Sequence, residues 1–408
     1  MLRIALSLLA LTACSAFSQV KVSVKLDRPD YLVGEPIFVI VEVTNIGSEP
    51  IGYSGGDGRT DVTVAAAQPK QPPNLHGCYS GVGFGSGLGL VSHPPLMAPG
   101  QTVSSRHLLR GYRMRSGAYT LRASGRADVR WFFGSGRNSS TVSDRKSGDP
   151  VEGAAFDVSL NLNLREGTED ELRERYAPYV KEAVTGNGLG DASHQARDAI
   201  AEMAPPFLEK TILEFARQPQ DAALAVEGLG QIPTRESRAD LIQLFDRTAD
   251  MHLRALITEK LAGIATPEEL PFFASLLPGR STAPDDKIRE YAILGLGRLG
   301  GDDAVKALQS LRASPNPEIR RPVALALGNT RSPAAVPILI EMYSDEAARD
   351  HACMSLATLT HHQWCDDDGT TAETQTMWRD WWRTHASRST IFGMDQCIPL
   401  DRLLPLAK

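Results

Sequence analysis

Two periods of hydrophobic and polar residues divide the chain into two halves. From Val20 to about Leu164, short runs such as VKVSVKLD, VIVEVTN and AFDVSLNLNL alternate apolar with polar residues, and segments such as MAPGQTV separate them. Alternation with a period of two buries one face of a β-strand. Short strands separated by glycine and proline turns predict an all-β antiparallel sandwich for residues 20–165.

After Gly167 the period changes to that of α-helices. The segment TEDELRERYAPYVKEAV begins with Thr168 and carries Glu171 three residues later, which is the capping-box pattern of a helix N-terminus. From there to about Trp382, segments rich in alanine, leucine and glycine recur at helical spacing, as in AALAVEGLG and IREYAILGLGRLG. We therefore predict a boundary between Leu164 and Thr168, with strands before it and helices after it.

The helical half is repetitive. Each repeat contains a first helix rich in small residues and a second helix such as RADLIQLFDR or AVKALQSL. Four of the first helices end near a glycine, at intervals of 33, 34 and 31 residues: Gly230, Gly263, Gly297 and Gly328. A period of about 30 residues with one helix pair predicts an all-α superhelix, or α-solenoid, for residues 168–364, with a C-terminal cap and tail at 365–408. Small residues let the first helices stack closely, and glycine can end a helix in the left-handed conformation.

Each half resembles a known family. In the first half the resemblance rests on Asp-x-x-x-Tyr-x-x-Gly-Glu-Pro, Val-x-Val-x-Asn, Pro-Gly-Gln and Gly-x-Tyr-x-Leu, which here include Tyr31, Gly34, Glu35, Pro36, Val41, Val43, Asn45, Pro99, Gly100, Gln101, Gly117, Tyr119 and Leu121. These motifs look like the immunoglobulin-like sandwich common at the start of exported bacterial proteins. The repeats resemble HEAT repeats, in particular the short type of phycobilisome lyases. Together the resemblances imply an exported bacterial HEAT-like repeat protein with an N-terminal immunoglobulin-like domain.

The first residues, MLRIALSLLALTACSAFSQ, predict a secretory signal over residues 1–19. One basic residue, Arg3, precedes an apolar run that is too short to be a permanent membrane helix. Two processing routes stay open: LTAC resembles a bacterial lipobox, which would lipidate Cys14 and anchor the chain, and AFS before Gln19 resembles a signal-peptidase site. We therefore expect an exported protein that is periplasmic, anchored to the outer membrane as a lipoprotein, or secreted.

Composition narrows the choice of partners. The formal net charge is −6 and there is no long basic run, so nucleic acid is not an expected partner. No stretch after the signal is apolar enough to span a bilayer. The glycines of Gly83–Gly89 have the spacing of a phosphate-binding loop, but the VSHPP that follows cannot start the helix that such a loop needs. We expect a connection between strands there, and no cofactor.

An arginine recurs near the start of the first helices, seven to nine residues before the repeated small residue. This arginine ladder contains Arg197, Arg254, Arg289, Arg320 and Arg349. Equivalent positions of successive repeats line up along a solenoid. One interpretation is a groove for an anionic ligand. The other, which we expect because such ladders are a habit of the resembled repeats, is a structural ladder in which each arginine bonds an acidic side chain or a helix carbonyl of the next unit.

The stretch LTHHQWCDDDG, which begins at Leu359, contains the residue types that transition metals bind. His361 and Cys365 are four residues apart, which suits a helical metal site, whereas His361 and His362 would point about 100° apart on a helix. The run DDDG after Cys365 ends the helix, and no HExxH or CxxC framework supports a site. The following MWRDWWRTH places Trp378 on one face with two further tryptophans, which suits a cap. We expect a cap loop, with a metal site as the alternative.

The cysteines that follow the signal are compatible with one or two disulfides. Cys365 and Cys397 both lie outside the repeating helices, whereas Cys353 lies within one and Cys78 lies in the glycine-rich stretch. A thiol inside a packed helix behaves as a small apolar side chain. In an oxidising compartment the expected pair is therefore Cys365–Cys397, and closing that loop of about 30 residues would stabilise the fold by about 3–4 kcal/mol.

No catalytic motif emerges from the sequence, which has no GxSxG and no recognisable frame of paired carboxylates. The repeats alone do not transfer the bilin-attaching activity of the lyases that they resemble. We therefore expect a non-enzymatic, exported interaction or scaffold protein, in which the sandwich serves for positioning and a curved solenoid surface binds a protein partner in the cell envelope. The alternative is a metal-dependent enzyme that uses His361, Cys365 and the Asp-rich loop. Binding faces of solenoids carry no motif, so the sequence does not name the partner.

Overall fold

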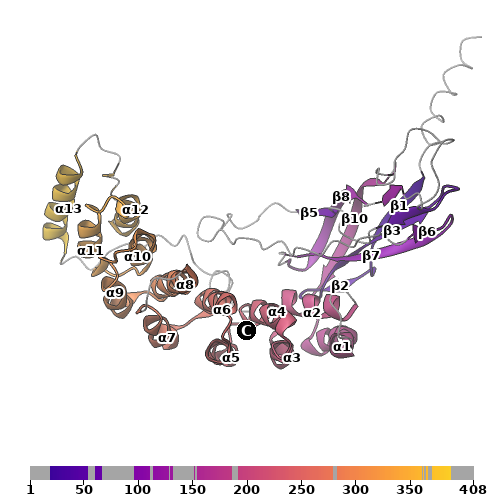
Figure 1. Ribbon diagram of the computed structural model, residues 1–408, viewed down its shortest axis with the longest axis horizontal. Coiled ribbons are helices and arrows are strands. Elements are labelled where there is room, and N and C mark those ends of the chain that lie inside the picture. The colour runs from indigo at the N-terminus through magenta and orange to yellow at the C-terminus, as the bar shows by residue number, and fades with distance from the viewer. Residues whose placement is uncertain are drawn as a thin grey trace, which may run out of the picture. The chain divides into compact units, whose positions relative to one another are not determined.

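The computed structural model describes residues 19–53, 60–66, 96–110, 114–127, 129–131, 151, 154–185, 192–278, 283–360, 362, 364–365 and 370–386. Within these ranges all the strands precede all the α-helices (Figure 1). The chain divides into two compact units, Met1–Ala199 and Ile200–Lys408. The strand-rich first part and the helical remainder therefore agree with the two periods of the sequence.

The strands of the first unit form three small sheets. They are β1 (Val20–Leu26), β2 (Tyr31–Leu32), β3 (Phe38–Asn45), β4 (Ile51–Tyr53), β5 (Thr60–Ala66), β6 (Leu96–Met97), β7 (Thr102–Leu108), β8 (Gly117–Arg126), β9 (Val129–Trp131) and β10 (Ala155–Arg165). The strand orders are β1-β3-β7, β2-β10-β8-β5 and β6-β4-β9. Only the pairing of β2 with β10 is parallel among the described strands.

Alternation along the strands builds one shared core for the three sheets. Val39, Val41 and Val43 of β3 are buried, and they belong to the same apolar cluster as Ile51 of β4 and Phe156 of β10. Side chains at every second position of a strand point to the same face, so one face of each longer strand enters this cluster. The sequence predicted β1, β3, β8 and β10, whereas β5, β7 and the short β4, β6 and β9 were not predicted.

The helices are α1 (Glu169–Thr185), α2 (Ala192–Met203), α3 (Glu209–Phe215), α4 (Ala222–Leu229), α5 (Arg235–Arg247), α6 (Met251–Ile264), α7 (Leu270–Ser275), α8 (Ala283–Leu299), α9 (Gly301–Gln309), α10 (Pro317–Asn329), α11 (Ala335–Met342), α12 (Arg349–Thr360) and α13 (Thr371–His385). Helix α1 begins where the sequence predicted. The backbone N–H of Thr168 donates to the Glu171 carboxylate at 2.9 Å, and the N–H of Glu171 donates to the Thr168 hydroxyl at 3.2 Å. These two bonds form the predicted capping box.

The first compact unit ends at Ala199, further along the chain than the end of the last strand at Arg165. Helix α1 packs on the strands: the Tyr176 hydroxyl donates to the carbonyl oxygen of Gly34 at 2.8 Å. The ring of Tyr179 stacks on Phe38 of β3, with 6.0 Å between the ring centroids. These contacts explain why the unit extends to Ala199 although the last long strand ends at Arg165.

The helices of the second unit form a two-layered arc (Figure 1). Helices α4, α6, α8, α10 and α12 line its inner side, and α3, α5, α7, α9 and α11 line its outer side. The inner helices approach one another through glycine. A Cβ atom placed on Gly297 of α8 would lie 2.8 Å from the Cα of Ala326 on α10. A Cβ atom on Gly328 would lie 2.9 Å from the Cα of Ser355 on α12. Close packing of one layer curves a solenoid toward that side, so these glycines explain the arc.

The repeated glycines therefore do not act as the sequence suggested. Gly263, Gly297 and Gly328 lie within α6, α8 and α10, and none of them has a positive φ. Gly230 follows α4 with φ −66°. Positive φ angles occur instead at Gly300 (+72°) and the next residue, between α8 and α9, and at Ala204 and Arg331, shortly after α2 and α10. The expectation of left-handed helix ends at the repeated glycines was wrong; close helix contact requires glycine at Gly297 and Gly328.

Candidate interaction surface

The predicted arginine ladder is bonded to the backbone of the preceding helix or the turn after it. Each arginine lies on a first helix, and each donates to a carbonyl oxygen earlier in the chain. The bonds are Arg197 Nη1 to Ala183 at 2.8 Å, Arg254 Nε to Thr248 at 2.8 Å, Arg289 Nε to Leu277 at 2.9 Å, Arg320 Nη1 to Ser314 at 2.7 Å and Arg349 Nε to Tyr343 at 3.3 Å. The last carbonyls of a helix lack helical donors and carry partial negative charge, so a guanidinium suits them. These bonds are of the kind that a structural ladder needs, but they run to the preceding unit rather than the next.

Arg320 also bonds a carboxylate. Its Nη2 donates to Oδ1 of Asp345 at 3.1 Å, and its Nε donates to the other carboxylate oxygen. The hydrogen bond from Arg320 lowers the pKa of Asp345 below its ordinary value. The charge of this arginine is thus engaged by an acid in the turn before α12 as well as by backbone.

The inner face of α8, α10 and α12 carries large apolar side chains that are partly or fully open to solvent. Helix α10 has α8 and α12 on its two sides and α11 behind it, so only its inner face is uncovered. Five residues after the ladder arginine of each helix lies one apolar residue, and these are Leu294, Leu325 and Met354. The two leucines are half-buried, and Met354 is 61% exposed. We call these three residues the apolar row.

A second row accompanies the apolar row one helical turn earlier. Tyr291 of α8, Pro322 of α10 and His351 of α12 each precede the apolar residue of their helix by three positions and are half-buried. Residues three apart share a helix face, so each of them flanks its partner in the apolar row. We call these three residues the flanking row.

Further toward α4 the inner face is polar. Lys260 of α6 pairs with Glu227 of α4 at 2.8 Å and with Glu259 at 3.4 Å. Burial opposes the charge of Lys260, but the hydrogen bonds and negative charges of Glu227 and Glu259 together outweigh it, and the pKa of Lys260 is raised. Burial, assisted by a hydrogen bond with Glu259, also raises the pKa of Tyr291. The inner face therefore changes from a bonded polar network at α4 and α6 to apolar side chains at α8, α10 and α12.

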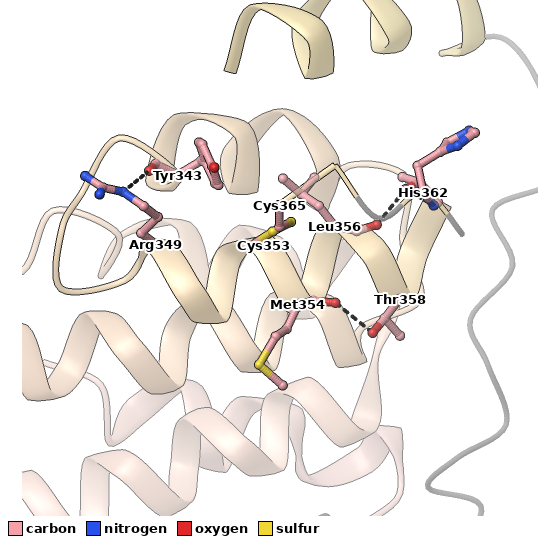
Figure 2. Close-up of a disulfide and its surroundings, with 9 residues drawn as sticks. Tyr343, Arg349, Cys353, Met354, Leu356, Thr358, His362 and Cys365 are labelled. Carbon is pink, nitrogen blue, oxygen red and sulfur yellow. Dashed lines mark hydrogen bonds between the residues drawn. A yellow bond between two sulfur atoms is a disulfide. The ribbon is translucent and has the colours of Figure 1, made fainter. Parts of the chain in front are cut away.

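The disulfide of the structure differs from the predicted one. Cys365 is bonded to Cys353 of α12, with 5.9 Å between their Cα atoms (Figure 2). The predicted partner, Cys397, lies outside the described residues. The sequence analysis assigned Cys353 to the apolar core because it lies within a helix. The structure instead pairs Cys365 with a cysteine only 12 residues earlier in the chain. Met354 projects from the opposite side of α12 (Figure 2).

The proposed metal ligands do not come together in the part of the chain that the structure describes. No group of three or more histidine, cysteine or acidic side chains that could hold a metal occurs there. A cysteine in a disulfide offers no thiolate, so Cys365 is not a ligand in this state. His362 stacks instead on Trp364, with 4.7 Å between ring centroids. His361 and the aspartates at 366–368 lie outside the described residues.

The tryptophans of α13 take part in one aromatic cluster. Trp378 is fully buried. The ring of Trp364 lies 4.6 Å from that of Trp378, and the ring of Trp381 lies 6.2 Å from it. Gln375 donates to the carbonyl oxygen of Ile340 in α11 at 2.7 Å, which joins α13 to the outer layer. Cys14, Cys78 and the glycines of Gly83–Gly89 lie outside the described residues.

Comparisons with known proteins support the repeat assignment. A family model for HEAT repeats matches residues 273–357, which include α8, α10 and most of α12. A search of curated proteins finds no match. Among the described residues, no helix is both long and apolar enough to cross a bilayer.

Several solved structures are weakly similar. The phycocyanin lyase complex from a Nostoc species has 20% identity and a TM-score of 0.30, covering 37% of this chain and 99% of that chain. Human deoxyhypusine hydroxylase has 16% identity and a TM-score of 0.22, covering 52% of this chain and 91% of that chain. Salmonella α2-macroglobulin has 14% identity and a TM-score of 0.18, covering 90% of this chain but only 25% of its own. These low scores carry no argument about activity.

Proposed function

We propose that the protein is a non-enzymatic scaffold that binds a partner polypeptide on the inner face of its solenoid. The observation that carries this proposal is the apolar row, in which Met354 is 61% exposed beside two half-buried leucines. Apolar surface that leaves water stabilises a complex by about 25 cal/mol per Å². The row lies on three neighbouring helices of the inner layer, so a single partner can cover all three residues.

HEAT repeats support this reading because they stack into extended surfaces that suit elongated partners. The arginine ladder supports it in a different way. Because each ladder guanidinium is bonded to a carbonyl oxygen, we propose that the ladder fixes the position of each first helix and leaves binding to the residues on the inner face.

We place this scaffold in the cell envelope. The signal-like residues 1–19 support export, and Cys14 is the residue at which a lipid would anchor the chain. We further propose that residues 20–165 are an immunoglobulin-like sandwich that positions the solenoid; the shared core of the three sheets supports it. Metal-dependent catalysis at His361 and Cys365 is the competing function. Elemental analysis of the purified protein separates the two, because only the enzyme binds a stoichiometric metal.

Site-specific photocrosslinking tests the proposed function. A benzophenone amino acid replaces Met354 or Leu325 on the inner face, and Lys306 on the outer helix α9 serves as the matched control, since its side chain is 75% exposed. The chains are irradiated with the envelope fraction of the native host. We expect the same polypeptide to be captured from both inner positions and not from the outer one. Equal capture from all three positions, or from none, contradicts the proposal.

A further inference from the structure

We infer that the partner segment lies on the apolar row in the polyproline II conformation, with an apolar residue at every third position and a basic residue beside one end. This inference rests on the proposed function and adds the conformation and chemistry of the ligand. It follows from the spacing of the inner helices, from the flanking row and from one unpaired charge.

The spacing of the inner helices sets the distance between the binding positions. Helices that pack side by side have axes about 8–10 Å apart. The near contact of Gly297 with Ala326, and of Gly328 with Ser355, holds α8, α10 and α12 close together, toward the lower end of this range. The three residues of the apolar row lie on three neighbouring inner helices, α8, α10 and α12. A ligand must therefore present apolar side chains about 8–10 Å apart along one line.

Polyproline II meets this spacing best among the regular conformations. It has three residues per turn and a rise of about 3.1 Å, so every third side chain lies on one face, about 9.3 Å from the last. A β-strand repeats the same face at about 6.6 Å or 13 Å. An α-helix repeats it at about 5.4 Å or, two turns on, about 10.5 Å.

The flanking row has the chemistry that this conformation needs. Tyr291, Pro322 and His351 are rigid or aromatic side chains, each beside one member of the apolar row. Polyproline II segments bind in grooves lined by such side chains, because the segment has no internal hydrogen bonds and its own rings pack against flat surfaces. The three flanking residues supply one flat surface per turn of the ligand.

Charge distinguishes one end of the row. Lys287 pairs with Glu290 at 2.9 Å on α8, and Arg321 pairs with Glu318 at 2.7 Å on α10. Asp350 of α12 is exposed, and no other residue in the described part of the chain forms an ion pair with it. It precedes the end residue of the apolar row by one helical turn. A lysine or arginine of the ligand placed beside its last apolar residue would complement this carboxylate.

Short synthetic peptides test this inference on the full chain. The probes are the fluorescein-labelled peptides LPPLPPLK and KLPPLPPL, whose leucines are three apart and whose lysine lies at opposite ends. The matched control, LLLPPPPK, has the same composition without the spacing, and a helical peptide with leucines two turns apart tests the alternative conformation. Fluorescence anisotropy measures the dissociation constants. We expect one of the two spaced peptides to bind at least about tenfold more tightly than either control.

Two substitutions locate the binding. Met354→Lys should weaken the spaced peptide by about tenfold or more, whereas Met377→Lys, at a 42% exposed methionine of α13, should not change it. Asp350→Asn should weaken binding at low salt and remove part of its salt dependence, with Asp303→Asn on α9 as the control. Unchanged thermal unfolding of the variants shows that each is folded.

The results separate the failure of this inference from that of the proposed function. If no spaced peptide binds, or if the helical peptide binds in its place, while the inner photocrosslinkers still capture a partner, the polyproline II ligand is wrong and the scaffold stands. If the inner positions capture nothing, the scaffold itself is wrong. Binding of a spaced peptide that Met354→Lys does not weaken also overturns the inference, because the peptide then lies elsewhere.

Discussion

The Nε atom of Arg289 donates a hydrogen bond to the carbonyl oxygen of Leu277 at 2.9 Å. This bond joins the first helix of one repeat to the end of the second helix of the repeat before it. Arg289 is 5% exposed, so water cannot take its place, and Asp286 accepts a further bond from the same guanidinium at 2.7 Å.

Replacing Arg289 with alanine should therefore destabilise the solenoid. A buried hydrogen bond to a charged group contributes about 1.5–3 kcal/mol, and the substitution also removes the ion pair with Asp286. Urea unfolding followed by circular dichroism measures the change. Lys306→Ala on α9 is the control, because that lysine is 75% exposed and its ion pair contributes little. Unchanged stability of the Arg289 variant, with lost binding of an anionic ligand, would favour the groove interpretation of the ladder.

Two glycines should respond in opposite directions to replacement by alanine. At Gly297 the new Cβ would lie 2.8 Å from the backbone Cα of Ala326, so α8 and α10 must move apart. Overpacking of this kind costs about 1–3 kcal/mol. At Gly263 the nearest atom is a side-chain nitrogen of Arg298 at 3.9 Å, and alanine is favoured over glycine within a helix by about 1 kcal/mol. Thermal unfolding should show a lower melting temperature for Gly297→Ala and an equal or higher one for Gly263→Ala. The same loss at both positions would argue against close contact as the role of Gly297.

Acid should remove the contribution that the Arg320–Asp345 pair makes to the stability of the fold. The pKa of Asp345 is lowered from its ordinary value of 3.8, chiefly by the hydrogen bond from Arg320. A depressed folded-state pKa contributes stability that is complete above pH 3.8 and is lost as the pH falls through the lower, folded-state value. The unfolding free energy of the wild type minus that of Asp345→Asn should thus be positive at neutral pH, and this difference should shrink as the pH falls below 3.8. A difference that grows on acidification contradicts the assignment.

Mass spectrometry of non-reduced peptides should find Cys353 linked to Cys365. In the chain-entropy model a loop of this size stabilises the fold by about 3 kcal/mol, so reduction should lower the melting temperature of the cap. The Cys353→Ser variant should show the same loss without reductant, and reductant should not lower it further. A peptide that links Cys365 to Cys397 would restore the pairing expected from the sequence alone.

Local signals in the sequence were sufficient where neighbouring residues decide the structure. Thr168 and Glu171 form the capping box because both partners lie within one turn of the chain. The repeat was visible because its glycines and arginines keep their phase. The reason for that phase was not visible: Gly297 is required by Ala326 on the next helix, a contact that no spacing within one repeat reveals.

The candidate site depended on contacts between elements and was therefore missed. Leu294 and Leu296 are both leucines of α8. Leu296 is buried, and only the arrangement of the neighbouring helices leaves Leu294 partly exposed. Cys353 was assigned to the core for a similar reason, since its helical position is correct but the path of the following loop is a tertiary feature. An apolar residue five positions after each of the ladder arginines of α8, α10 and α12 is the signal that could have indicated the inner face.

The affinity of the photocaptured partner for inner-face and outer-face variants tests the central claim most directly. Isothermal titration compares the wild type with Met354→Lys on the inner face and Lys306→Glu on the outer face, which are both exposed positions. A scaffold that binds through the apolar row predicts a dissociation constant at least about tenfold higher for Met354→Lys and unchanged for Lys306→Glu. Equal affinities for the wild type and Met354→Lys, or a loss only for Lys306→Glu, would contradict it.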